Sequence, residues 1–177
     1  MSVLRDQAER ERHQAERESK RLDIPKQNGG DYDEPWRSKG CRALSLAAIA
    51  QVHTGRIIPA GDVEAMLLRL SSDPLVVRPD NAETGTREHH IINEAFAMCG
   101  RPDMRGRQVG VRNQRGQGWQ ADAPHDYVIP EWPTSGSVGT HYTLEDAEGN
   151  ELYDSWDGDD LITGEPHSRL LYRVWEA

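Results

Sequence analysis

Cys41 has the residue type and the local sequence of a catalytic nucleophile. It follows Gly40 directly and opens a run from Ala43 to Ala50 that is apolar on most faces, which predicts a buried helix. At a helix N-terminus, the helix dipole and the unpaired backbone N–H groups favour the thiolate form of cysteine. The same N–H groups can stabilise an oxyanion that forms on a substrate carbonyl. Position alone leaves open a second interpretation, a buried structural cysteine.

The second cysteine, Cys99, lies late in a predicted helix that is capped by Thr86 and ended by Gly100. The helix dipole disfavours a thiolate at this end, so we interpret Cys99 as a structural residue. Two cysteines do not make a disulfide framework, and we expect both to be reduced in a cytosolic setting.

Of the seven histidines, His141 has a carboxylate at a suitable distance along the chain. Residues 140–156 have the pattern of a β-hairpin. If Glu145 pairs with Asn150 around the turn, His141 lies directly opposite Asp154, with the two Cβ atoms ~5 Å apart. A carboxylate there orients the imidazole and stabilises its charged form. A cross-strand His–Asp pair is often a surface ion pair, but beside a helix-start cysteine we interpret this one as catalytic.

The elements that must position these side chains change in type along the chain. A polar helix is predicted over 2–22 and a loop over 25–40, followed by helices that start at 41, 60 and 86. Short β-prone segments then follow, at 109–111, 127–129, 140–145, 151–156 and 170–175. Helices first and strands afterwards predict an α+β fold with a mainly antiparallel sheet.

Together these features resemble a papain-like cysteine peptidase. The resemblance rests on Gly40-Cys41 at the start of the Ala- and Leu-rich helix, Gly139-Thr140-His141 in a late strand, and Tyr153-Asp154 in the next strand. It is greatest to the compact branch that includes the double-glycine leader peptidases and related small domains, some of them from phages. Over residues 25–177 it implies N-terminal helices packed on a C-terminal sheet. It also implies that Cys41 is the nucleophile, His141 the base and Asp154 the residue that orients the base.

The chain departs from the family pattern at the oxyanion hole. The family usually has a Gln six residues before the nucleophile, and here that position is Pro35. Gln27 and Asn28 are the candidates to supply the missing donor, on the condition that the loop folds back toward Cys41.

Composition and charge limit the other classes of function. The chain has 177 residues, 36% of them hydrophobic, which suits one domain over 25–177 preceded by a polar helical arm over 1–24. The arm balances its charges, so the net charge of −9 belongs to the domain and argues against nucleic-acid binding. The arm is either a solvated helix or a docking site for a protein partner. We find no signal segment and no apolar run of the ~20 residues that span a bilayer. We therefore expect no membrane association, and a location in the cytoplasm or in a phage or other particle.

Two functions from different classes remain. The first is a cysteine peptidase or amidase-like hydrolase that acts on a peptide, isopeptide or cell-wall (peptidoglycan) amide bond through Cys41, His141 and Asp154. The second is a non-catalytic interaction or structural module with a papain-like fold, for example a phage particle component. Neither needs a cofactor or a metal ion, and the sequence contains no phosphate-binding glycine loop or dinucleotide fingerprint.

Overall fold

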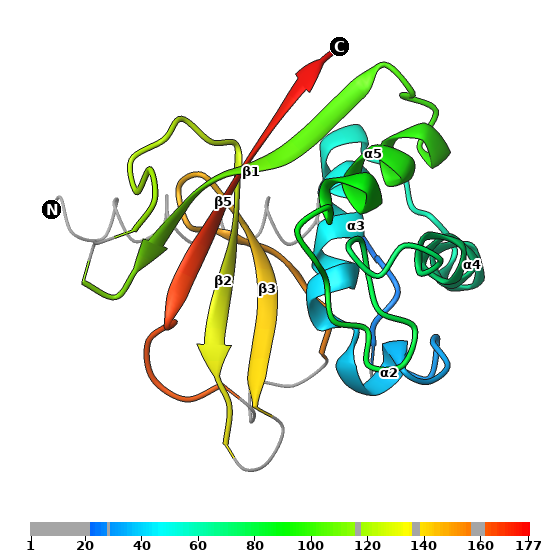
Figure 1. Cartoon of the computed structure of the whole chain (residues 1–177), viewed down its shortest axis with the longest axis horizontal. Coiled ribbons are helices and arrows are strands. Elements are labelled where there is room, and N and C mark those ends of the chain that lie inside the picture. Colours follow the sequence, from blue (N-terminus) through cyan, green and yellow to red (C-terminus); the bar gives the residue numbers. More distant parts are fainter. Residues whose placement is uncertain (1–21, 28, 116–117, 136–138, 157–161) are drawn as a thin grey trace, which may run out of the picture.

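The computed structural model describes residues 22–27, 29–115, 118–135, 139–156 and 162–177 (Figure 1). Helices come first: α2 (Trp36–Lys39), α3 (Cys41–Thr54), α4 (Ala60–Leu70) and α5 (His89–Met98). Strands follow: β1 (Met104–Asn113), β2 (Tyr127–Pro133), β3 (Thr140–Asp146), β4 (Glu151–Asp154) and β5 (Ser168–Glu176). The polar helix predicted over 2–22 lies almost entirely outside the described residues. None of the helices in the described part of the chain is long and apolar enough to cross a membrane.

The strands form one antiparallel sheet in the order β1-β5-β2-β3-β4. The helices gather on one side of the molecule and the sheet lies on the other (Figure 1). This arrangement confirms the predicted α+β class, with helices before a mainly antiparallel sheet. The first strand is longer than predicted, because pairing with β5 extends it from 109–111 to the whole of β1.

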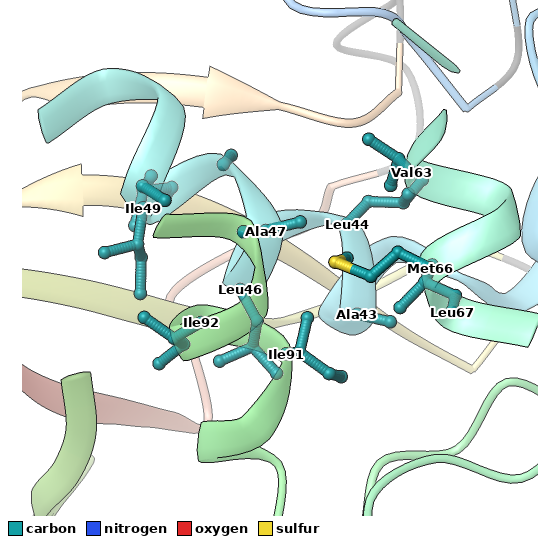
Figure 2. Close-up of a cluster of buried hydrophobic side chains, with 14 of the residues drawn as sticks. Ala43, Leu44, Leu46, Ala47, Ile49, Val63, Met66, Leu67, Ile91 and Ile92 are labelled. Atoms are coloured by element: carbon teal, nitrogen blue, oxygen red, sulfur yellow. The ribbon is translucent and has the colours of Figure 1, made fainter. Parts of the chain in front are cut away.

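Helix α3 forms the centre of the core, as its apolar run predicted. All nine residues from Ala43 to Gln51 are buried. Figure 2 shows side chains of α3 that point toward the apolar faces of α4 and α5. The helix ends at Gly55, whose positive φ of 68° favours glycine. Burial on several faces fixes the direction of α3, and with it the position of Cys41 at its first turn.

Helix α5 differs from its prediction at both ends. The predicted cap, Thr86, lies outside the helix, which begins at His89 after an N-cap at Glu88. Glu88 is buried, and its carboxylate accepts hydrogen bonds from the hydroxyls of Thr84, one turn earlier, and of Tyr172, on the distant β5. The Tyr172 contact is one that a local cap pattern does not contain. At the other end the helix stops at Met98, which is 39% exposed.

The β3–β4 hairpin forms with a register different from the predicted one. Asp154 pairs with Thr143, not with His141. The physical reason lies in the turn: the Asp146 N–H donates to the Asn150 carbonyl, so the loop has three residues instead of four. Gly149, with φ 86°, and an irregularity in the pairing beyond Leu144 accommodate the change. His141 and Asp154 are therefore diagonal neighbours on the sheet, still within reach of each other.

The segment 22–27 packs along the end of β4, and we call it the strap. Ile24, which the sequence assigned to the arm, is only 2% exposed and belongs to the core. The Pro25 carbonyl accepts a hydrogen bond from the Tyr153 hydroxyl at 2.9 Å. The boundary predicted between residues 24 and 25 therefore falls inside a segment that packs on the domain.

Candidate active site

Cys41 is the first residue of α3 and is half-buried. Gly40 precedes it, and a Cβ at that position would lie 2.5 Å from the Trp36 carbonyl oxygen, so the turn between α2 and α3 accepts only glycine without rearrangement. The Cys41 Sγ lies 3.9 Å from the carbonyl oxygen of Thr140 on β3. The backbone N–H of a first helical residue has no partner within its own helix. Cys41 thus offers both a thiol and an N–H group at the helix end.

His141 lies beside Cys41 and is held by Asp154. The side chains of His141 and Asp154 are buried, at 4% and 8% exposed, and His141 Nε2 lies 2.7 Å from Asp154 Oδ1. The same Oδ1 accepts the backbone N–H of Trp156 at 2.8 Å, which fixes the carboxylate. Because Asp154 engages Nε2, Nδ1 is the ring nitrogen left for the Cys41 thiol. The predicted pair exists, although the predicted register does not.

The pKa of His141 is raised to about 9. Burial by itself lowers this pKa, but the hydrogen bonds with Asp154 and Cys41 and the negative charges of those two groups outweigh it. The imidazole is therefore protonated at neutral pH. A cationic His141 next to the sulfur stabilises a thiolate, as in an ion pair of the Cys–His type.

Gln27 and Cys41 line one pocket, so the loop that carries Gln27 folds back toward Cys41. The side chain of Gln27 is 1% exposed, its N–H donates to the Ser155 carbonyl at 2.6 Å, and its Oε1 accepts the Ser155 hydroxyl at 3.0 Å. The occupied Oε1 leaves the Nε2 N–H groups of Gln27 as its donors toward the pocket. Asn28, the other candidate donor, lies outside the described residues. Pro35 stands at the N-cap of α2.

A pocket of about 450 Å³ contains these groups. Cys41, His141 and Gln27 all line it. Its walls come from segments far apart in sequence: Ser38, Lys39, Arg42, residues 81–84, Thr134, Thr140, Tyr142 and Trp156. Most of these side chains are polar, and Ala82 and the rings of Tyr142 and Trp156 add apolar surface.

Sequence reasoning missed the loop 81–84 and Arg42. Arg42 follows the nucleophile, its guanidinium lies 5.6 Å from the centre of the Tyr142 ring, and it forms an ion pair of 2.8 Å with Glu88. Glu88 also accepts the hydroxyl of the fully buried Tyr172. Arg42 therefore ties the start of α3 to β3 and β5. The sequence carries no local signal for this contact, because Arg42 and Glu88 come from distant segments and the burial of Glu88 arises from their packing.

Cys99 has the opposite surroundings. It is 2% exposed at the end of α5, and its thiol donates to the carbonyl of Arg56 at 3.8 Å. Burial raises the pKa of this thiol. These observations agree with the structural role predicted for Cys99.

Within the described residues, no group of three or more His, Cys, Asp or Glu side chains is arranged to hold a metal ion.

Comparison of the chain with protein-family models, with curated proteins and with solved structures finds no match.

Proposed function

We propose that the protein is a cysteine peptidase or amidase-like hydrolase with a papain-like fold. The observation that supports it most is the meeting of Cys41, His141 and Gln27 in one pocket, with His141 held by the buried carboxylate of Asp154. The groups supply a nucleophile, a proton carrier with an orienting partner, and an amide donor. The helices before an antiparallel sheet agree with the papain-like arrangement but do not require it.

The proposed reaction proceeds in two stages. The Cys41 thiolate attacks the carbonyl carbon of an amide, and the carbonyl electron pair becomes an oxyanion. The N–H of Cys41 and Nε2 of Gln27 donate hydrogen bonds to that oxyanion. The C–N bond breaks as the His141 imidazolium gives its proton to the leaving amine, which leaves a thioester and neutral His141. Water then attacks the thioester with His141 as base, and the acid and the thiolate are released.

The substrate class is a peptide, an isopeptide or a cell-wall amide. Lys39, Arg42 and Trp156 also line the pocket, so groups on either side of a scissile bond have side chains to contact. The four groups named above supply all the chemistry, so the reaction needs no cofactor. We propose the cytoplasm, or a phage or other particle, as the location. Of the arm predicted over 1–24, we propose residues 1–21 as a docking site for a protein partner, since residues 22–24 belong to the strap.

The alternative is a non-catalytic interaction module, and it rests on Pro35 in place of the usual Gln. Gln27 weakens that alternative, because it brings an amide donor to the pocket from another part of the chain. The enzyme is therefore the function we put forward.

A substrate screen tests the proposal. Fluorogenic peptides, isopeptides and muramyl peptides are incubated with the wild-type protein and with Cys41→Ala, and new amines are detected. Turnover by the wild type that Cys41→Ala lacks would support the enzyme. The proposal fails if no substrate is cleaved and iodoacetamide alkylates Cys41 no faster than it alkylates glutathione at pH 7.

A further inference from the structure

Three consecutive residues at the end of β4 hold three consecutive residues of the strap. The Tyr153 hydroxyl donates to the Pro25 carbonyl, and Lys26 Nζ donates to the Asp154 carbonyl. Lys26 also lies over the Tyr153 ring, 4.9 Å from its centre. The third contact joins Ser155 to Gln27. Each of the last three residues of the strap, from Pro25 to Gln27, is therefore held by its own contact with β4 or with Ser155.

Ser155 makes two hydrogen bonds to Gln27, one that fixes its backbone and one that fixes its side chain. Its carbonyl accepts the Gln27 N–H, and its hydroxyl donates to Oε1 at 3.0 Å. A free glutamine amide can turn either end toward a neighbour, because its O and N differ little in size. A hydroxyl that donates to Oε1 selects one orientation, with Nε2 directed elsewhere. Ser155 is fully buried, and it is not among the residues that line the pocket.

Asp154, the neighbour of Ser155, holds the ring of His141. Two adjacent residues therefore fix two separate parts of the site, the proton carrier and the amide donor. We propose that Ser155 is a positioning residue that sets the orientation of Gln27 as oxyanion donor. The inference rests on the proposed function and adds a residue to it. Ser155 acts through Gln27 and touches no reacting atom.

Two small probes separate this role from a general effect on the site. p-Nitrophenyl acetate acylates a thiolate through an oxyanion: the S–C bond forms, p-nitrophenolate leaves, and an acetyl thioester remains. Iodoacetamide alkylates the same thiolate by displacement of iodide, with no oxyanion. The ratio of the acylation rate to the alkylation rate at Cys41 therefore reports the oxyanion donors. Both rates are measured in full-length protein, with Cys41→Ala as the blank.

Ser155→Ala should lower the acylation rate by about 10-fold to 100-fold, the upper value being that of a lost oxyanion donor. The alkylation rate should stay within about twofold of the wild-type rate. In a Gln27→Ala background, Ser155→Ala should add no further loss, because the residue it positions is gone. Ser45→Ala is the matched control: Ser45 is also fully buried, its hydroxyl donates to the Tyr142 carbonyl at 3.3 Å, and its loss should leave the ratio unchanged.

Gln27→Glu is the second variant, for use if Ser155→Ala does not fold. The carboxylate still accepts the Ser155 hydroxyl but offers no N–H. Its charge disfavours the thiolate and slows both reactions, so the expected result is a fall in the ratio of the acylation rate to the alkylation rate.

The inference is overturned if Ser155→Ala lowers both rates equally or neither, if Ser45→Ala lowers the ratio as much, or if Gln27→Glu leaves the ratio unchanged. Failure of the proposed function itself would give a different result: iodoacetamide would alkylate Cys41 of the wild-type protein no faster than it alkylates glutathione. The two failures are therefore distinguishable.

Discussion

The start of α3 and the end of α5 each carry a cysteine, and the two regions treat the same side chain in opposite ways. Cys41 lies at a helix N-terminus, half-buried in a pocket beside a protonated His141. Cys99 lies at a helix C-terminus, 2% exposed, with its thiol turned to a backbone carbonyl. The comparison shows that the end of the helix and the access to solvent, and not the residue type, decide what a thiol can do.

The largest expected contrast is in turnover. Cys41→Ala should lower kcat on any substrate found in the screen by about 10⁴-fold or more, since it removes the nucleophile. Cys99→Ala should retain kcat and lower the free energy of unfolding by about 1 kcal/mol, as a buried side chain is truncated. Steady-state kinetics and denaturant unfolding measure the two effects. Loss of activity in Cys99→Ala with the fold intact would break the comparison.

Loss of the base should rank next. His141→Ala should lower kcat/KM by about 10² to 10⁴-fold, because the leaving amine loses its proton donor. His53→Ala serves as a control, since His53 is exposed near the end of α3 and contacts Tyr127 and Phe96, which do not line the pocket. Alkylation by iodoacetamide should slow at Cys41 in His141→Ala and stay unchanged at Cys99. An unaltered rate at Cys41 would show that His141 does not stabilise its thiolate.

The pH dependence should sharpen the contrast further. His141 has a pKa of about 9 in the folded protein, above the ordinary value of 6.5, so its charged contacts stabilise the fold fully below pH 6.5 and lose that contribution as the pH rises through 9. Activity should fall over the same alkaline range. Asp154→Asn should move this fall to lower pH and cost roughly 10-fold in kcat, because Asn still orients the ring without the charge. Melting temperatures and turnover rates from pH 6 to 10 measure the effects on stability and on activity. If Asp154→Asn does not move the alkaline fall in activity, that fall does not come from His141.

The smallest effect should come from the arm. Removal of residues 1–21 should leave the alkylation rates of Cys41 and Cys99 within about twofold of the wild-type rates, the size of an ordinary surface effect. The contacts that determine the reactivity of the two thiols lie among the described residues. The melting temperature should change by no more than the few degrees that ~1 kcal/mol gives. Mass spectrometry of the alkylated protein and a thermal melt provide the measurements. Unfolding on truncation would show that the arm belongs to the domain.

The sequence predicted local features better than long-range ones. The burial of α3 followed from its continuous apolar run, and the opposite positions of Cys41 and Cys99 followed from the helix ends. The pairing of His141 with Asp154 was predicted from a wrong register, because the sequence does not show that the turn closes between Asp146 and Asn150 with three loop residues.

Contacts between distant segments could not be predicted from local patterns. Gln27 could not be preferred to Asn28, because its partner, Ser155, is 128 residues away. The bond between Arg42 and Glu88 and the loop 81–84 were missed for the same reason. Such contacts depend on how whole elements pack, which a pattern of neighbouring residues does not contain.

The strap has a consequence for solubility as well. Among the described residues, β4 is the last strand of the sheet and pairs only with β3. Unpaired outer strands are templates for aggregation between chains, and proteins commonly cover or charge them. Lys26 and Gln27 bond the carbonyls of Asp154 and Ser155 at the end of this strand, and the Lys26 cation lies over Tyr153. The segment that brings Gln27 into the pocket therefore also covers the end of this outer strand, so the proposed oxyanion donor and the protection of the strand end come from the same segment.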